Sequence, residues 1–114
     1  MSKYDELPVY KASYELMTSI YSFASDFSRE HKHTIGEKMK DEMFELFLIL
    51  YRTNRAEKKY DELERGREKV ERIKLLVRLS KDLKLLNIKR FAHLNSKIQE
   101  VSKQICGWQK SLEI

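Results

Sequence analysis

The last quarter of the chain carries an apolar stripe that constrains the fold more than any other feature. Apolar residues recur there at steps of three or four, and they are Ile88, Phe91, Leu94, Ile98, Val101, Ile105, Trp108 and Leu112. Because one turn of an α-helix takes 3.6 residues, this spacing puts the whole stripe on one face of a long helix. Such a face is stable in water only when other elements cover it, so we expect partner helices.

The same period predicts a helix near the start of the chain. Pro8 suits a first helical turn, where its missing N–H costs nothing. The apolar face that follows consists of Val9, Ala12, Leu16, Ile20, Phe23 and Phe27. The polar run 28–33 interrupts the pattern and is expected to be a loop.

A second helix is expected to begin at Thr34. Glu37 follows three residues later, which is the capping-box spacing. The core face of this helix is expected to be Ile35, Met39, Met43, Leu46 and Leu50. The stretch from Met43 to Tyr51 is apolar almost all round, which is more than one buried face requires. The segment 54–56 is the expected end of this helix.

A third helix is predicted from about Lys58 to Leu86. Its apolar face is expected to be Leu63, Val70, Ile73, Leu76, Val77, Leu83 and Leu86, with Leu75, Leu79 and Leu85 in excess. Asn87 follows it, either as the N-cap of the last helix or as a left-handed hinge.

The composition agrees with this helical reading. The chain has 114 residues, which is the length of one domain. It contains 3 Gly and 1 Pro, which are too few turn-forming residues for a many-stranded sheet fold. We therefore expect an all-α fold, an antiparallel up-down-up-down four-helix bundle forming one domain over residues 1–114. The apolar residues form no membrane-length run, so no membrane partner is expected. A single cysteine suits a reducing cytoplasm, and no signal peptide is recognised.

No residue pattern typical of an enzyme is present. His31 and His33 lie in the polar run, His93 stands alone, and there is no Glu-x-x-His pair for a di-metal bundle. Cys106 has no histidine near it in sequence and is expected to be a small buried group. We expect no catalytic residue, no metal and no cofactor.

The positive charge is concentrated in the second half of the chain. Residues 69–110 contain eleven basic and three acidic side chains, although the whole chain has a net charge of only +5. Lys74, Arg78 and Lys81 share one helical face, and Lys84 follows three residues on. Two interpretations remain open for this row: a solvated basic face, or a contact with phosphates or an acidic partner.

The surplus apolar residues of the second helix predict self-association. Phe44, Phe47, Leu48 and Tyr51 exceed what one bundle face buries, and we expect them to form an interface between copies.

Three segments of the chain resemble a known family. They are residues 7–16, which read LPVYKASYEL, residues 73–86, which read IKLLVRLSKDLKLL, and Gly107-Trp108. Together they resemble the superfamily that contains the accessory variability determinant (Avd) of diversity-generating retroelements and the proteins encoded in intervening sequences of bacterial ribosomal RNA genes.

This resemblance implies a function that the residues alone do not give. Avd-like proteins are non-enzymatic basic bundles that assemble into a barrel-like homopentamer, bind the element's reverse transcriptase and template RNA, and support mutagenic cDNA synthesis. The paired basic positions of the family fall on Lys74 and Arg78, and the expected binding residues also include Lys81, Lys84 and Lys11. Trp108 is expected to pack structurally, with Gly107 allowing close helix approach. The alternative is a structural or protein-interaction bundle of the intervening-sequence type without a nucleic-acid role.

Overall fold

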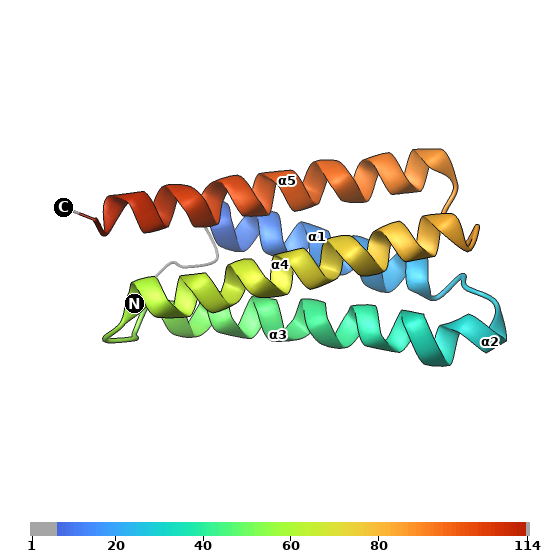
Figure 1. Cartoon of the computed structure of the whole chain (residues 1–114), viewed down its shortest axis with the longest axis horizontal. Helices are drawn as coiled ribbons and strands as arrows, with labels where there is room; N and C mark the ends of the chain where they lie inside the picture. The colour runs from blue at the N-terminus through green and yellow to red at the C-terminus, as the bar shows by residue number, and fades with distance from the viewer. Residues whose placement is uncertain (1–6, 114) are drawn as a thin grey trace.

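The computed structural model describes residues 7–113, which form a bundle of four long helices measuring 46 × 22 × 22 Å (Figure 1). The long helices are α1 (Pro8–Ala24), α3 (Glu37–Thr53), α4 (Lys59–Asp82) and α5 (Ile88–Ser111), and the short segments α2 (Arg29–His31) and η2 (Lys32–Gly36) precede α3. Successive long helices run in opposite directions, so the predicted up-down-up-down bundle is confirmed. Residues 1–6 and 114, which the expected domain includes, lie outside the described residues.

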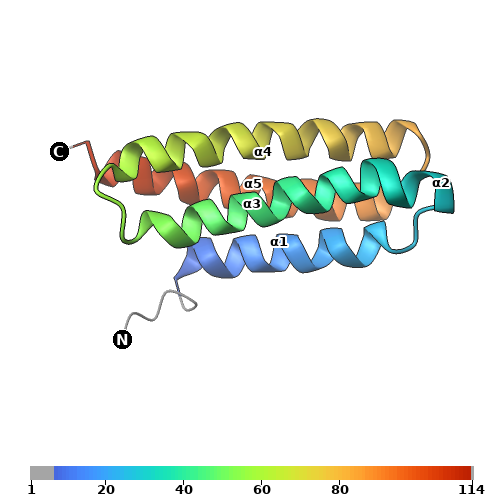
Figure 2. The same ribbon diagram turned by 90° about the horizontal axis from the view of Figure 1, so that it is seen from below.

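Each long helix packs against two others. α3 and α5 both contact α1 and α4, whereas α1 and α4 lie diagonally across the bundle and appear at opposite edges in Figure 2. The centre is filled by side chains that are at most 2% exposed, among them Leu16, Ile20, Met39, Met43, Leu46, Leu50, Leu63, Ile73, Leu94 and Ile105. Burial of each such side chain stabilises the fold by about 1.5–3 kcal/mol relative to exposure, which explains why the apolar stripes meet in the centre.

The expected loop over residues 28–33 is wrong, because the chain is already helical from Arg29. The prediction of a capping box at Thr34 is also wrong, because Thr34 already lies inside a helical segment. Its hydroxyl donates to the carbonyl of Glu30 at 3.1 Å, as in a helix interior. The wide π-turn of η2 buries Gly36 against the end of α1, where a Cβ atom would lie 3.7 Å from Ala24, the last residue of α1, and 3.4 Å from the nearby Phe27 ring. Close packing with α1 therefore holds this polar segment in a helix.

The third helix ends earlier than predicted, at Asp82 instead of Leu86. Lys84 adopts a left-handed conformation with a φ of 64°. The amide of Leu85 donates across the turn to the carbonyl of Ser80 at 2.8 Å. This is the Schellman closure, which satisfies orphan carbonyls at a helix end and is usually built on glycine.

Three residues of the predicted apolar faces are exposed, and all three lie at helix ends. Asn87 is an N-cap and not a hinge, because its side chain accepts a hydrogen bond of 2.7 Å from the amide of Arg90. Ile88, the first residue of α5, is 78% exposed, and Leu112, which follows its last residue, is 38% exposed. Leu83, expected in the core, is 44% exposed because α4 ends there.

Close helix approach occurs at Gly66 and not at Gly107. A Cβ atom on Gly107 would meet nothing within 4 Å, so the expectation for that residue is wrong, whereas one on Gly66 would lie 3.6 Å from Leu46 of α3. The predicted structural packing of Trp108 is confirmed. Its ring meets that of Tyr10 edge-on, with centroids 6.4 Å apart.

Candidate nucleic-acid and partner interface

Three of the predicted cations form a row on the second half of α4, on its side toward α5. Lys74 lines a groove that α5 completes, and the Lys81 ammonium lies 4.9 Å from the centre of the Phe91 ring of α5. Arg78 lies one helical turn from Lys74, and its side chain is 68% exposed. We call Lys74, Arg78 and Lys81 the basic row.

The groove beside Lys74 has a volume of about 460 Å³ and a lining that sequence reasoning missed. From α5 it receives Asn95, Gln99, Ser102, Lys103 and Cys106, together with Ile98. Within the described part of the chain, no carboxylate lines this α4–α5 groove. Cys106 is half-buried here, not buried as expected. These residues are far from Lys74 in sequence, so the groove becomes recognisable only once α4 and α5 are paired.

Two acids reduce the positive charge of the basic row without cancelling it. Lys74 pairs with Glu71 at 3.3 Å, and Arg78 pairs with Asp82 at 3.4 Å. All four side chains are more than half exposed, and ion pairs of this kind contribute only about 0–1 kcal/mol. Both cations therefore stay accessible to a stronger anion such as phosphate.

The other two predicted binding residues do not join the basic row. Lys84 lies beyond the end of α4, in the left-handed turn. Lys11 lies on α1, diagonally across the bundle from α4. It belongs to a different cluster, in which the hydrogen bond and charge of Lys97, with a smaller contribution from Lys11, hold the pKa of Glu15 below its ordinary value.

The first half of α4 is joined to α3 by an ion cluster. The Lys69 ammonium lies 3.0 Å from Glu42 and 2.6 Å from Glu45, and Arg72 approaches Glu42 at 3.8 Å. The hydrogen bond from Lys69 lowers the pKa of Glu45, and the same contact raises the pKa of Lys69. Charges in this region thus stabilise contacts within the bundle.

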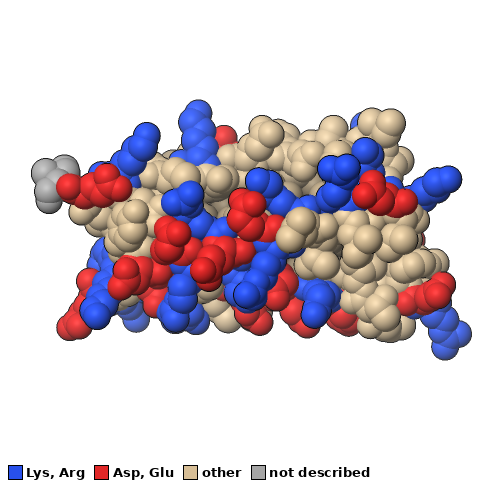
Figure 3. Space-filling view, in the orientation of Figure 1, with Lys and Arg blue, Asp and Glu red and all other residues tan. Residues whose placement is uncertain are grey.

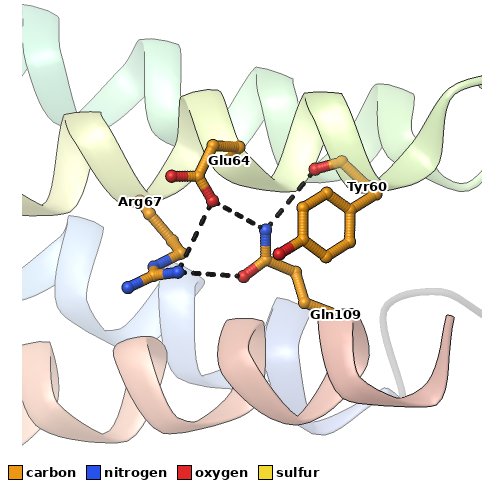
Figure 4. A network of polar contacts seen from close by, with 4 residues as sticks. All are labelled: Tyr60, Glu64, Arg67 and Gln109. Carbon is orange, nitrogen blue, oxygen red and sulfur yellow. Dashed lines mark hydrogen bonds and ion pairs between the residues drawn. The ribbon is translucent and has the colours of Figure 1, made fainter. Parts of the chain in front are cut away.

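A second cross-bundle network joins the start of α4 to the end of α5 (Figure 4). Gln109 is buried, and its amide nitrogen donates to Glu64 at 3.0 Å and to the Tyr60 carbonyl at 3.4 Å. Its amide oxygen accepts from Arg67 at 3.4 Å. Because both the nitrogen and the oxygen of the buried amide have hydrogen-bond partners within the chain, we interpret this network as a contribution to the stability of the fold and not as a binding site.

An exposed row of leucines lies on the second half of α4. Leu75, Leu79 and Leu83 follow at steps of four residues and are 71%, 45% and 44% exposed. Figure 3 shows an area without charged side chains over this half of α4 and the neighbouring start of α3, whereas acids and bases intermingle over the first half of α4. We call these three residues the leucine ridge.

Exposed aromatic rings lie where α1 and α3 meet. Of the predicted interface residues, Phe44 and Tyr51 are 46% and 38% exposed, whereas Phe47 and Leu48 are half-buried. Two rings from α1 that sequence reasoning missed lie beside them. Tyr14 packs 6.2 Å from Phe47, and Tyr21 is 5.6 Å from the Lys40 ammonium. We call Tyr14, Tyr21, Phe44 and Tyr51 the aromatic face.

The candidate metal-binding side chains are dispersed. His31 contacts Ser28 and His93 contacts Ser19, each at 3.0 Å. Among residues 7–113 there is no group of three His, Cys, Asp or Glu side chains arranged to hold a metal ion. None of the described helices combines the length and apolar character needed to cross a membrane.

An antiparallel bundle with a basic groove and uncovered apolar surface has the features of a helical binding module. The family model described as bAvd-like matches residues 8–112, so the chain belongs to the family of Avd proteins of diversity-generating retroelements. Membership identifies it as an accessory protein of such an element, in a family that is generally non-catalytic. A comparison with curated proteins gives no match.

Proposed function

We propose that this protein binds the template RNA and the reverse transcriptase of its retroelement and thereby supports mutagenic cDNA synthesis. The observation that carries the RNA part is the basic row beside the α4–α5 groove. Family membership supports the reverse transcriptase as the protein partner.

The chemistry of the groove suits a phosphate backbone. Lys74 and Lys103 line the groove and supply charge. Arg78, one helical turn from Lys74 on α4, adds a guanidinium that can form paired hydrogen bonds with phosphate oxygens. Asn95 and Gln99 offer amide groups to ribose hydroxyls or phosphates. Contacts of this type position an RNA without reading its sequence, so the groove is proposed to recognise backbone and shape.

We further propose that the protein works as a homo-oligomer, a homopentamer by analogy with the family, in the cytoplasm where its RNA is made. The exposed aromatic face and leucine ridge support self-association. Contiguous apolar surface of this kind is typical of interaction sites in water-exposed proteins.

Fluorescence anisotropy of a labelled structured RNA, titrated with the protein at several salt concentrations, tests the RNA part. Binding is expected to weaken steeply as salt rises, because phosphate contacts release counterions. Absent or salt-insensitive binding refutes RNA recognition and leaves the basic row as a solvated surface.

Charge reversal tests the location of the site. Lys74→Glu with Arg78→Glu is expected to weaken RNA binding by at least on the order of tenfold, since two attractions become repulsions. The matched control, Arg55→Glu with Lys58→Glu, changes the net charge equally at exposed positions away from the groove. Equal losses in both variants contradict a localised site.

The reverse transcriptase is tested separately by co-purification with the reverse transcriptase of a diversity-generating retroelement, co-expressed with this protein. Failure to co-purify at low salt, with the fold intact by circular dichroism, refutes that partner and leaves the RNA measurement standing.

A further inference from the structure

Three neutral polar side chains of α5 line the α4–α5 groove. They are Asn95, Gln99 and Ser102, which follow at steps of four and three residues and so share one face of α5. Asn95 and Ser102 are half-buried, whereas Gln99 is exposed. Among residues 7–113, no hydrogen bond joins any of these three side chains to another group. Their donors and acceptors are therefore available to a molecule that lies in the groove.

Similar side chains elsewhere on α5 are bonded within the chain. The Gln104 amide donates to Glu100 at 2.8 Å, and the buried Gln109 amide bonds to α4. In the groove, the unbonded side chains lie beside cations instead. Lys74 and Lys103 both line it, and Lys103 forms no ion pair within the described residues. The groove thus combines positive charge with neutral hydrogen-bonding groups, and both kinds of group bind phosphate and ribose oxygens.

The width of the groove limits the form of RNA that reaches these side chains. α4 and α5 pack side by side, as Figure 1 shows, and the axes of packed helices lie about 8–10 Å apart. An RNA duplex is wider than this, because a full base pair separates its two backbones. A duplex laid on the bundle therefore meets the exposed cations, Lys74 and Lys103, but does not reach the half-buried Asn95 and Ser102.

We infer that the α4–α5 groove takes a single strand of RNA, whose phosphates meet Lys74 and Lys103 and whose backbone oxygens hydrogen-bond with Asn95 and Ser102. This inference rests on the proposed RNA binding and names the form of RNA that the groove accepts. A positively charged groove that follows one backbone is typical of single-strand binding. The described lining has no aromatic ring on which bases stack, so the affinity is expected to depend little on sequence.

Substitution of the two half-buried side chains tests this inference. The groove variant is Asn95→Ala with Ser102→Ala. The matched control is Ser96→Ala with Gln104→Ala, which also removes one hydroxyl and one amide from α5 but at positions outside the lining of the groove. Alanine is the best helix former, so both variants are expected to fold, and circular dichroism checks this.

Fluorescence anisotropy with two labelled RNAs gives the readout. One is an oligouridylate of about twelve nucleotides, which stays single-stranded, and the other is a duplex of about twelve base pairs. The groove variant is expected to bind the oligouridylate on the order of tenfold more weakly than wild type, because two ordinary hydrogen bonds are lost. Its affinity for the duplex should not change. The salt dependence should also match wild type, since neither side chain is charged.

Other results overturn the inference. Wild-type affinity of the groove variant for the oligouridylate means that the strand does not reach Asn95 and Ser102. Equal losses for the two RNAs mean that these side chains do not distinguish a single strand from a duplex. An equal loss in the control variant means that the effect is not specific to the groove. In each case, weaker binding by Lys74→Glu with Arg78→Glu leaves the proposed RNA binding standing, whereas a wild type that binds neither RNA refutes both.

Discussion

The two halves of α4 use charge in different ways. Residues 59–72 hold five basic and five acidic side chains, whereas residues 73–84 hold four basic and one acidic. In the first half, Lys69 and Arg67 reach acids and amides on α3 and α5. In the second half, Lys74 and Arg78 pair with exposed acids on their own helix, and leucines are exposed beside them. The charges of the first half thus stabilise contacts between helices, whereas the charges and leucines of the second half remain exposed on the surface.

The largest expected effect is on the free energy of unfolding when one leucine is truncated in each half of α4. Leu63→Ala removes a fully buried side chain from the first half, and we expect a loss of about 2–5 kcal/mol in the free energy of unfolding. Leu75→Ala removes a side chain that is 71% exposed and should change stability by less than about 0.5 kcal/mol. Urea unfolding of the dilute, dissociated protein measures both. Comparable losses mean that the leucine ridge belongs to the fold.

The α5 side of the groove provides the next test. Lys103→Glu is expected to weaken RNA binding several-fold, because it reverses one charge in the α4–α5 groove. Lys110→Glu makes the same change on α5 at an exposed position outside the lining of that groove. Anisotropy titrations at one salt concentration compare them. If the Lys110 variant loses as much affinity, overall charge and not the groove governs binding.

A substitution in the turn after α4 separates the effect of backbone strain on stability from the effect of side-chain charge on RNA binding. Lys84→Gly should stabilise the protein by roughly 1 kcal/mol, because glycine adopts the left-handed conformation without a steric penalty. RNA affinity should fall little, since Lys84 lies outside the basic row. Thermal or urea unfolding checks the first effect. A destabilised variant contradicts the left-handed turn.

The smallest expected effect is a pH dependence in the first half. Because the pKa of Glu45 is lowered, its pairing with Lys69 stabilises the fold at pH values above the ordinary glutamate pKa. This stabilisation is lost as the pH falls through the lowered pKa of Glu45. Lys69→Met should therefore reduce stability at neutral pH, and the difference from wild type should shrink under acid conditions. Urea unfolding is compared at about pH 7 and about pH 2, so that the acid measurement lies well below the ordinary glutamate pKa and Glu45 is protonated. An undiminished difference at low pH points to packing instead.

Helical period predicts most of the bundle but not its ends. Repeating apolar residues such as Leu94, Ile98 and Ile105 identify buried faces because burial dominates the stability of a long helix. The end of α4 was missed because its left-handed residue is Lys84, and lysine gives no signal for such a turn. The helical turn before α3 was missed because contact with α1 outweighs the polar character of that segment.

The candidate site was predictable only where its residues share one helix. Lys74, Arg78 and Lys81 follow from their spacing on α4. The groove residues Asn95 and Lys103 come from another helix, and nothing in their own spacing indicates that they face Lys74.

The salt dependence of RNA binding tests the central claim most directly, namely that the second half of α4 is a phosphate-binding surface. The logarithm of the association constant is measured against the logarithm of salt concentration for wild type and for Lys74→Glu with Arg78→Glu. Loss of two phosphate contacts predicts a slope flatter by about 1.5, with an unchanged urea midpoint. Equal slopes and affinities for the two proteins contradict the claim.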